Sequence, residues 1–119
     1  MPQTTFEYVV AKFTPDFVKD EPINIGIIIH EKNSLESYGK FIDNFDEIKN
    51  KNPEINVNAL QKIVEGYRGK HEIYSEDYLY RLVKNCVHTL HFKNVCGKKA
   101  VSSELAVDQL FDEYISIKS

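Results

Sequence analysis

The sequence predicts an α+β domain: a small antiparallel sheet of three or four strands, with about three helices packed on one face. Two patterns predict this class. The apolar alternation typical of strands dominates residues 6–42, and apolar residues at helical spacing dominate later segments. Strands gathered before helices favour α+β over alternating α/β. The length of 119 residues is that of one domain, so we expect residues 1–119 to form a single unit.

Residues 6–13 are predicted to form a central strand, because both sets of alternating positions are largely apolar. Residues 31–34 are a polar turn of hairpin length, and residues 35–42 are predicted to return as an antiparallel third strand. The polar, irregular stretch after it is expected to be anchored by Phe45 and Ile48.

Residues 23–30 give the strongest strand signal. Isoleucine at every second position, from 23 to 29, forms a β-branched ladder that suits one face of a sheet. We expect an inner strand there. Asn24, Gly26, Ile28 and His30 are expected to line its other face.

Three amphipathic helices are predicted to follow the strands. Gly69 is expected to end the first helix in a left-handed conformation, and Ser75 to cap the start of the second. Residues 91–97 are a candidate short strand. The helices are predicted over residues 56–68, over residues 76–90, and after Ser102.

Composition narrows the function classes. The net charge of −3, from 15 basic and 18 acidic residues, is unlike that of most duplex-DNA binders, so no duplex DNA is expected. No basic segment followed by an apolar one begins the chain, and no aliphatic run could span a bilayer. Two cysteines are too few for a disulfide scaffold. We therefore expect a cytoplasmic protein with reduced thiols and no membrane contact.

Two cysteines and two histidines lie close together in the sequence: Cys86, His88, His91 and Cys96. This is a zinc-ligand inventory, but the spacing is not a usual zinc pattern. His88 would lie about 200° around a helix from Cys86. We expect a buried Cys86, surface histidines, and no metal or cofactor. Nothing orients a base toward Cys96, so no catalytic residue is assigned.

A small basic cluster, Lys93, Lys98 and Lys99, is a candidate site for single-stranded nucleic acid. Tyrosines at 74, 78 and 80 could supply stacking faces for bases. The simpler interpretation is that the lysines are solvated and the tyrosines cover an edge of the fold.

The most distinctive stretch, residues 8–29, contains a candidate ligand site formed by Lys12, Glu21, Asn24 and Gly26. A glycine within a strand often marks a bulge or a close backbone approach, so Gly26 could floor a shallow site. The alternative is a structural network, because an amide on an apolar strand face needs a partner. We favour the network, in which Asn24 anchors the loop that precedes its strand.

The same stretch resembles an uncharacterised prokaryotic family known as domain of unknown function 3037. Its members look like Y-x-V-x-R-x-x-P followed by E-x-x-N-x-G and an aliphatic run. Matching positions are Tyr8, Pro15, Glu21, Asn24 and Gly26, and the closing helix is similar around Leu110, Phe111 and Tyr114. Lys12 stands where arginine is common, and Pro22 where an aromatic is common.

The resemblance implies no activity. Some relatives are thought to be encoded beside kinases of the HipA-like type, which implies a toxin–antitoxin or defence setting. Because no catalytic signature is present, the sequence favours a non-catalytic protein-interaction module whose partner is another protein. The alternative is an enzyme or nucleic-acid-processing domain that uses Lys12, Glu21 and Asn24.

Overall fold

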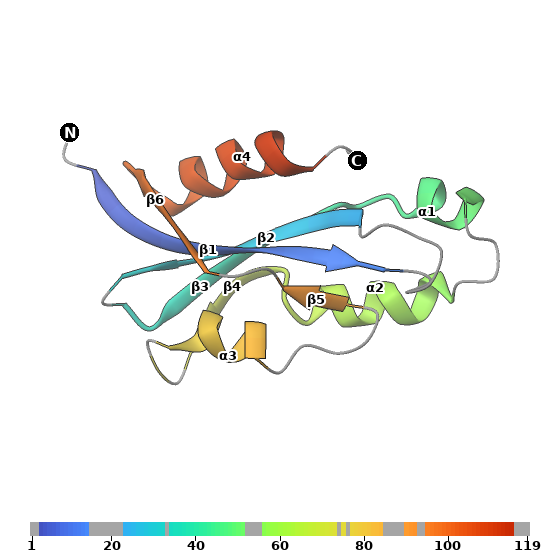
Figure 1. Ribbon diagram of the computed structural model, residues 1–119, viewed down its shortest axis with the longest axis horizontal. Coiled ribbons are helices and arrows are strands. Elements are labelled where there is room, and N and C mark those ends of the chain that lie inside the picture. The colour runs from blue at the N-terminus through green and yellow to red at the C-terminus, as the bar shows by residue number, and fades with distance from the viewer. Residues whose placement is uncertain are drawn as a thin grey trace.

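The computed structural model places strands in the middle of the molecule and helices on either side of them (Figure 1). It describes residues 3–14, 23–32, 34–51, 56–73, 75, 77–84, 90–92 and 95–115. Within these residues the elements are β1 (Thr4–Phe13), β2 (Ile23–Glu31), β3 (Glu36–Phe41), α1 (Asp46–Lys51), α2 (Val57–Glu65), β4 (Gly69–Glu72), α3 (Tyr78–Lys84), β5 (Leu90–Phe92), β6 (Cys96–Ala100) and α4 (Ser103–Tyr114).

The α+β class is correct, but the predicted sheet of three or four strands is wrong. The described residues form six antiparallel strands in the order β4-β3-β2-β1-β5, with β6 also paired to β1. The same described residues contain four helices rather than about three. Two short strands account for the larger number of strands. One is β4. The other arises because two strands, β5 and β6, pair with β1 where one was predicted.

Strands β5 and β6 lie one after the other along the same side of β1. Phe92 is opposite Ala11 and Cys96 is opposite Tyr8. The described residues therefore hold two strands, β5 and β6, where a single short strand was predicted over residues 91–97.

Helices cover both faces of the sheet, so the prediction of one covered face is wrong (Figure 1). Tyr8 contacts Tyr114 of α4, whereas the preceding residue, Glu7, accepts a hydrogen bond from Tyr80 of α3. Successive strand residues point to opposite faces, which places α4 and α3 on opposite sides. The reason lies in β1 and β2, whose apolar residues on both faces need cover on both sides.

A β-bulge in β2 changes the direction of its side chains. Ala11 lies opposite Gly26, but the next residue, Lys12, lies opposite Asn24. The extra residue of β2 is Ile25. Asn24 therefore shares the α4 face with Lys12, and Gly26 lies on the opposite face. The predicted common face for Asn24 and Gly26 is wrong, and so is the unbroken isoleucine ladder.

The other strand predictions are confirmed. β2 is an inner strand between β1 and β3, and β3 returns antiparallel to it. Phe45 and Ile48 are both buried, as expected of anchors, but part of the segment predicted to be irregular forms the short helix α1, which contains Ile48 and begins directly after Phe45. No helix in the described ranges is long and apolar enough to cross a membrane.

Helix boundaries differ from the predictions because turns take part of the expected length. α2 ends at Glu65 with Gly66 as its C-cap, and Gly69 adopts the left-handed conformation (φ 85°) as the first residue of β4 rather than as a cap. α3 is shorter than the predicted helix, and residues 85–89 lie outside the described part of the chain. α4 begins after Ser102, whose hydroxyl accepts a hydrogen bond from the Leu105 amide, as a capping residue should.

Candidate functional site

Lys12 and Asn24, two of the predicted site residues, form a network that holds α4. The Lys12 Nζ donates to Asn24 Oδ1 over 2.8 Å, and Asn24 Nδ2 donates to the main-chain oxygen of Tyr114 over 2.9 Å. Both ends of the amide are therefore engaged. Tyr114 is the last residue of α4, so this amide ties β1 and β2 to the helix that covers them. Glu21 lies outside the described residues.

A second link joins β1 to α4. The hydroxyl oxygens of Tyr8 and Tyr114 lie 2.9 Å apart, and the ring centroids 5.9 Å apart. Burial raises the pKa of Tyr8 well above its ordinary value, and the hydrogen bond with Tyr114 raises this pKa further. Tyr8 therefore stays protonated near neutral pH, and its hydroxyl acts as a structural contact rather than as a base.

Gly26 makes room for an aromatic cluster rather than for a ligand. A Cβ at this position would lie 2.2 Å from the ring of Phe41. The Phe41 ring packs 6.5 Å from that of Tyr67, which in turn packs 5.5 Å from Phe92, measured between centroids. Gly26 and Asn24 lie on opposite faces, so the described residues do not assemble the shallow site that was predicted around the pair.

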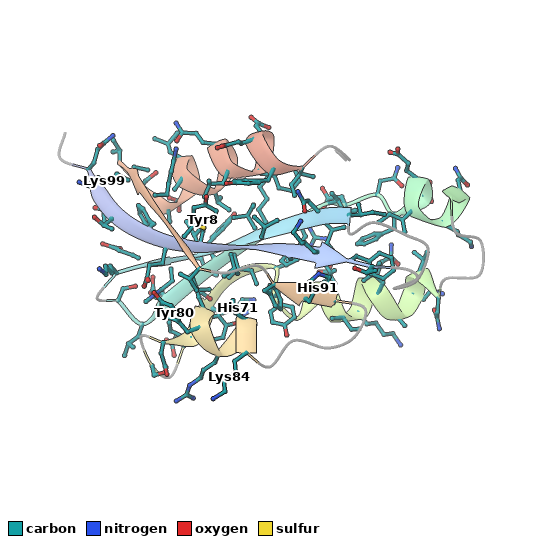
Figure 2. All side chains as sticks on the ribbon, in the orientation of Figure 1. Tyr8, His71, Tyr80, Lys84, His91 and Lys99 are labelled. Carbon is teal, nitrogen blue, oxygen red and sulfur yellow. The ribbon has the colours of Figure 1, made fainter. Side chains whose placement is uncertain are left out.

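The two described lysines of the predicted basic cluster, Lys98 and Lys99, do not share a face. Lys98 lies opposite Phe6 and Lys99 opposite Thr5, and neighbouring strand residues point in opposite directions. Both belong to the edge strand β6, and Figure 2 labels Lys99 at its end near the N-terminus. Lys93 lies outside the described residues. The two described lysines therefore lie on a strand edge and do not form a single positively charged patch.

The histidine and cysteine set is only partly described. His91 and Cys96 lie opposite β1 residues that are four positions apart, which is about 13 Å along a strand. Burial lowers the pKa of His91, and the nearby Lys12 lowers it further. Cys86 and His88 lie outside the described residues, so the absence of zinc stays a prediction. Among the residues described, no three His, Cys, Asp or Glu side chains gather as metal ligands would.

Sequence reasoning missed a polar row that crosses four strands on the α3 face. Directly opposed positions align Glu7, His30, Ser37 and His71 from β1 to β4. Polar residues at inward positions of apolar strands were the available signal, but only the strand register shows that they meet. His30 is 1% exposed, and its Nε2 lies 2.6 Å from the main-chain oxygen of Ser34.

This row resembles a serine–histidine–acid triad in composition, but its geometry differs. In a triad one imidazole nitrogen bonds the nucleophile and the other bonds the acid. Here the Nε2 of His30 is engaged by a carbonyl, and its Nδ1 lies 3.9 Å from Glu7 Oε1, beyond hydrogen-bond distance. The middle of the row, His30 and Ser37, is therefore part of the interior, and its two ends, Glu7 and His71, are partly buried.

The carboxylate of Glu7 orients an exposed aromatic residue on α3. Tyr80 is 54% exposed, and its hydroxyl donates to Glu7 Oε2 over 2.8 Å. Tyr80, together with Asp77, Arg81 and Lys84, lines an open hollow of about 380 Å³. These four residues are called the α3 surface below, and Figure 2 labels Tyr80 and Lys84 on it.

Two residues of the α3 surface form an exposed ion pair. Arg81 Nε lies 3.2 Å from Asp77 Oδ2, one helical turn away. A hydrogen bond from Ser75 lowers the pKa of Asp77, and Arg81 lowers this pKa further, so the carboxylate stays ionised near neutral pH. The hydrogen bond to Glu7 raises the pKa of Tyr80, which keeps its hydroxyl a donor. The α3 surface thus presents an oriented phenol beside two cations and one anion.

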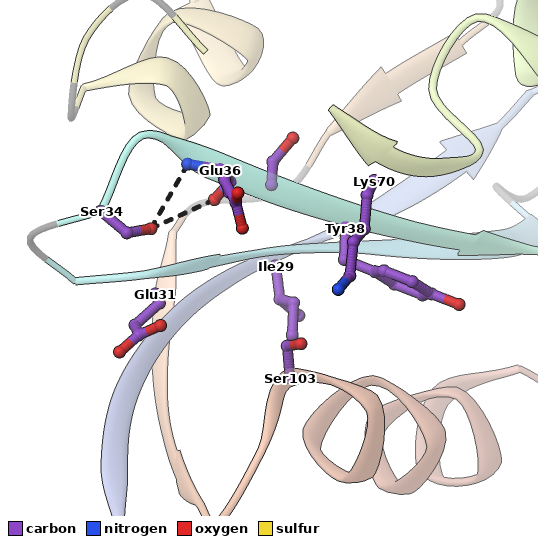
Figure 3. A pocket seen from close by; sticks show the side chains of 8 residues that line it. Ile29, Glu31, Ser34, Glu36, Tyr38, Lys70 and Ser103 are labelled. Atoms are coloured by element: carbon purple, nitrogen blue, oxygen red, sulfur yellow. Dashed lines mark hydrogen bonds between the residues drawn. The ribbon is translucent and has the colours of Figure 1, made fainter. Parts of the chain in front are cut away.

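A second, smaller hollow lies between the β2–β3 hairpin and the start of α4 (Figure 3). Its volume is about 40 Å³, which is room for a few water molecules at most. Lys70 Nζ lies 3.6 Å from Glu104 Oε1 beside it. The hollow is too small for a substrate or cofactor. It is lined by Ile29, Glu31, Ser34, Glu36, Ser37, Tyr38, Lys70 and Ser103.

No family model, no curated protein and no solved structure that was compared with the chain matches it. The resemblance of residues 8–29 to domain of unknown function 3037 therefore stays a prediction.

Proposed function

We propose that this domain is a non-catalytic protein-interaction module that binds another protein through the α3 surface. The observation that carries the proposal is Tyr80, which is 54% exposed and yet fixed by its hydrogen bond to Glu7. An exposed side chain normally loses rotamer freedom when a partner binds, at a cost of about 0.5–1.5 kcal/mol. A ring that is already oriented avoids part of this cost.

The composition of the α3 surface supports the same proposal. Tyrosine and arginine are the residues most enriched at the centres of protein interfaces, where a few side chains supply most of the affinity. Tyr80 and Arg81 are neighbours here, and Lys84 adds a second positive charge. A partner that offers a shallow apolar pocket for the phenol and carboxylates for the two cations would complement this surface.

The enzyme alternative has less support. Lys12 and Asn24 are bonded to each other, and Asn24 is bonded to the end of α4, so their polar atoms serve the fold. Gly26 lies on the other face against Phe41. Binding of single-stranded nucleic acid through Lys98 and Lys99 also has less support, because the two lysines face opposite ways. Cytoplasmic location and a toxin–antitoxin or defence setting stay expectations from the sequence.

Affinity capture with quantitative mass spectrometry tests the proposal. The wild-type domain is compared with a Tyr80→Ala/Arg81→Ala variant and with Lys62→Ala/Ile63→Ala, which removes an exposed apolar and a basic side chain from α2. We expect a protein that wild type and the α2 variant retain and the α3 variant loses. Capture of the same proteins by all three would contradict a role for the α3 surface. Circular dichroism of each variant confirms that it is folded.

A further inference from the structure

Within the part of the chain that the structure describes, strand β6 forms an edge of the sheet. It pairs with β1 on one side, and no other strand in the described ranges pairs with it (Figure 1). Cys96, Gly97 and Lys99 are exposed. An edge strand presents a row of main-chain N–H and C=O groups directed away from its own sheet. These groups can form hydrogen bonds with a further extended segment, which then becomes an additional strand.

The positive charges of Lys98 and Lys99 determine which kind of segment can pair with the β6 edge. Lys98 and Lys99 project from opposite faces of β6, so an added strand would meet one positive charge on each face. Opposite charges on directly facing strand residues are stabilising, and like charges are destabilising. Two consecutive acidic residues in a partner strand would place one carboxylate beside each lysine. The edge is basic although the whole chain has a net charge of −3.

Two exposed apolar residues follow β6 in the chain. Val101 directly follows β6 and is 41% exposed, and Leu105 in the first turn of α4 is 50% exposed. The other flank of α4 is occupied, because Asp108 pairs with Lys40 of β3 and Glu104 with Lys70 of β4. An apolar side chain of an added strand could cover Val101 and Leu105 just beyond the lysines.

We infer that the β6 edge binds an extended acidic segment of another protein as an added strand. Two consecutive Asp or Glu residues pair with Lys98 and Lys99, and a nearby apolar residue packs on Val101 and Leu105. The inference shares with the proposed function only the premise that this domain binds proteins. It uses a surface made of residues other than those of α3.

A second copy of this chain fits the edge less well than an acidic partner. When two identical edge strands pair antiparallel about a two-fold axis, each strand meets its own sequence. The consecutive lysines of one β6 would then approach those of the other, and like charges opposite one another are destabilising. Lysine on an edge strand is a common means of preventing such self-pairing. The same two charges attract a strand of opposite sign.

A displayed library of random decapeptides tests the inference, with the whole domain as bait. We expect enrichment of peptides with adjacent acidic residues and a neighbouring apolar residue. A synthetic peptide of the enriched sequence is expected to lose affinity by about tenfold or more for a Lys98→Glu/Lys99→Glu variant. The variant's own selection is expected to shift to basic peptides. The Tyr80→Ala/Arg81→Ala variant should bind the acidic peptide like wild type, which separates this edge from the α3 surface.

Amide hydrogen exchange supplies a second readout. Strand addition predicts that alternate amides of β6 gain protection when the enriched peptide is bound, while amides of α3 do not change. Three outcomes would overturn the inference: no enriched peptide, enriched peptides without acidic residues, or equal affinity for wild type and the charge-reversed variant. Sedimentation showing a dimer that Lys98→Glu/Lys99→Glu dissociates would assign the edge to a second copy instead.

Discussion

At the scale of single residues, the polar side chains of the predicted ligand site that the structure describes, Lys12 and Asn24, stabilise the fold instead. Asn24 is the clearest case, because its oxygen accepts from Lys12 and its NH2 group donates to the last carbonyl of α4. The sequence predicted that this amide needs partners. It could not identify Tyr114 as one of them, because that contact spans 90 residues of chain and depends on where α4 ends.

Replacing Asn24 with alanine is predicted to lower the free energy of unfolding by about 1–3 kcal/mol, because a part-buried carbonyl and ammonium both lose a partner. Urea unfolding monitored by circular dichroism measures the difference. An unchanged or higher stability would instead indicate that Asn24 is held for binding at a cost to the fold.

Gly26 offers a second test at this scale. Gly26→Ala is predicted to destabilise the domain by about 1–3 kcal/mol, because the new Cβ would lie 2.2 Å from the Phe41 ring and force the aromatic cluster apart. Gly97→Ala is the matched control, since the nearest atom to its Cβ, the Phe6 carbonyl oxygen, is 4.0 Å away. Equal melting temperatures for the two variants would show that Phe41 does not require the glycine.

Tyr8 predicts how stability depends on alkaline pH. Burial raises its pKa in the folded state, so the neutral phenol favours folding below the ordinary pKa of 10.0, and this contribution is lost as the pH rises above that value. Wild type should therefore lose stability progressively as the pH rises above about 10. Tyr8→Phe should be less stable at neutral pH but lose less over this range. Parallel pH profiles for the two proteins would contradict the assignment.

At the scale of elements, the sequence predicted long periodic segments well and short ones poorly. β1, β2, β3 and α4 each have a clear apolar period and were found where expected. β4 has the sequence Gly-Lys-His-Glu and no apolar alternation, so its position depends on pairing with β3 rather than on propensity. The bulge at Ile25 was also beyond prediction, because it is a property of two paired strands.

The start of α4 gives a prediction at this scale. Ser102→Ala is predicted to cost about 1 kcal/mol of stability, because the Leu105 amide loses its capping hydroxyl. Ser103→Ala is the matched control, since its hydroxyl bonds only to the exposed Glu104 side chain among the contacts described. Chemical denaturation should separate the two variants. A larger loss for Ser103→Ala would show that the helix is capped differently.

At the scale of the whole molecule, the central sheet determines which surfaces are left for partners. β1 and β2 are apolar on both faces, so α4 on one side and α3 on the other are both needed as cover (Figure 1). When helices cover both faces of a sheet, a partner can still bind at the edges of the sheet or at the outer sides of the helices. The α3 surface and the β6 edge are two such places, and the β6 edge could not be predicted without the strand order.

The central claim is that Tyr80, oriented by Glu7, is the main binding contact of the domain. The most direct test is calorimetric titration of the captured partner with wild type, Tyr80→Phe, Tyr80→Ala and the Lys62→Ala/Ile63→Ala control. We predict a loss of affinity of at least about tenfold for Tyr80→Ala, a smaller loss for Tyr80→Phe, which keeps the ring but not its anchor, and none for the control. Equal affinities for wild type and Tyr80→Ala would contradict the claim.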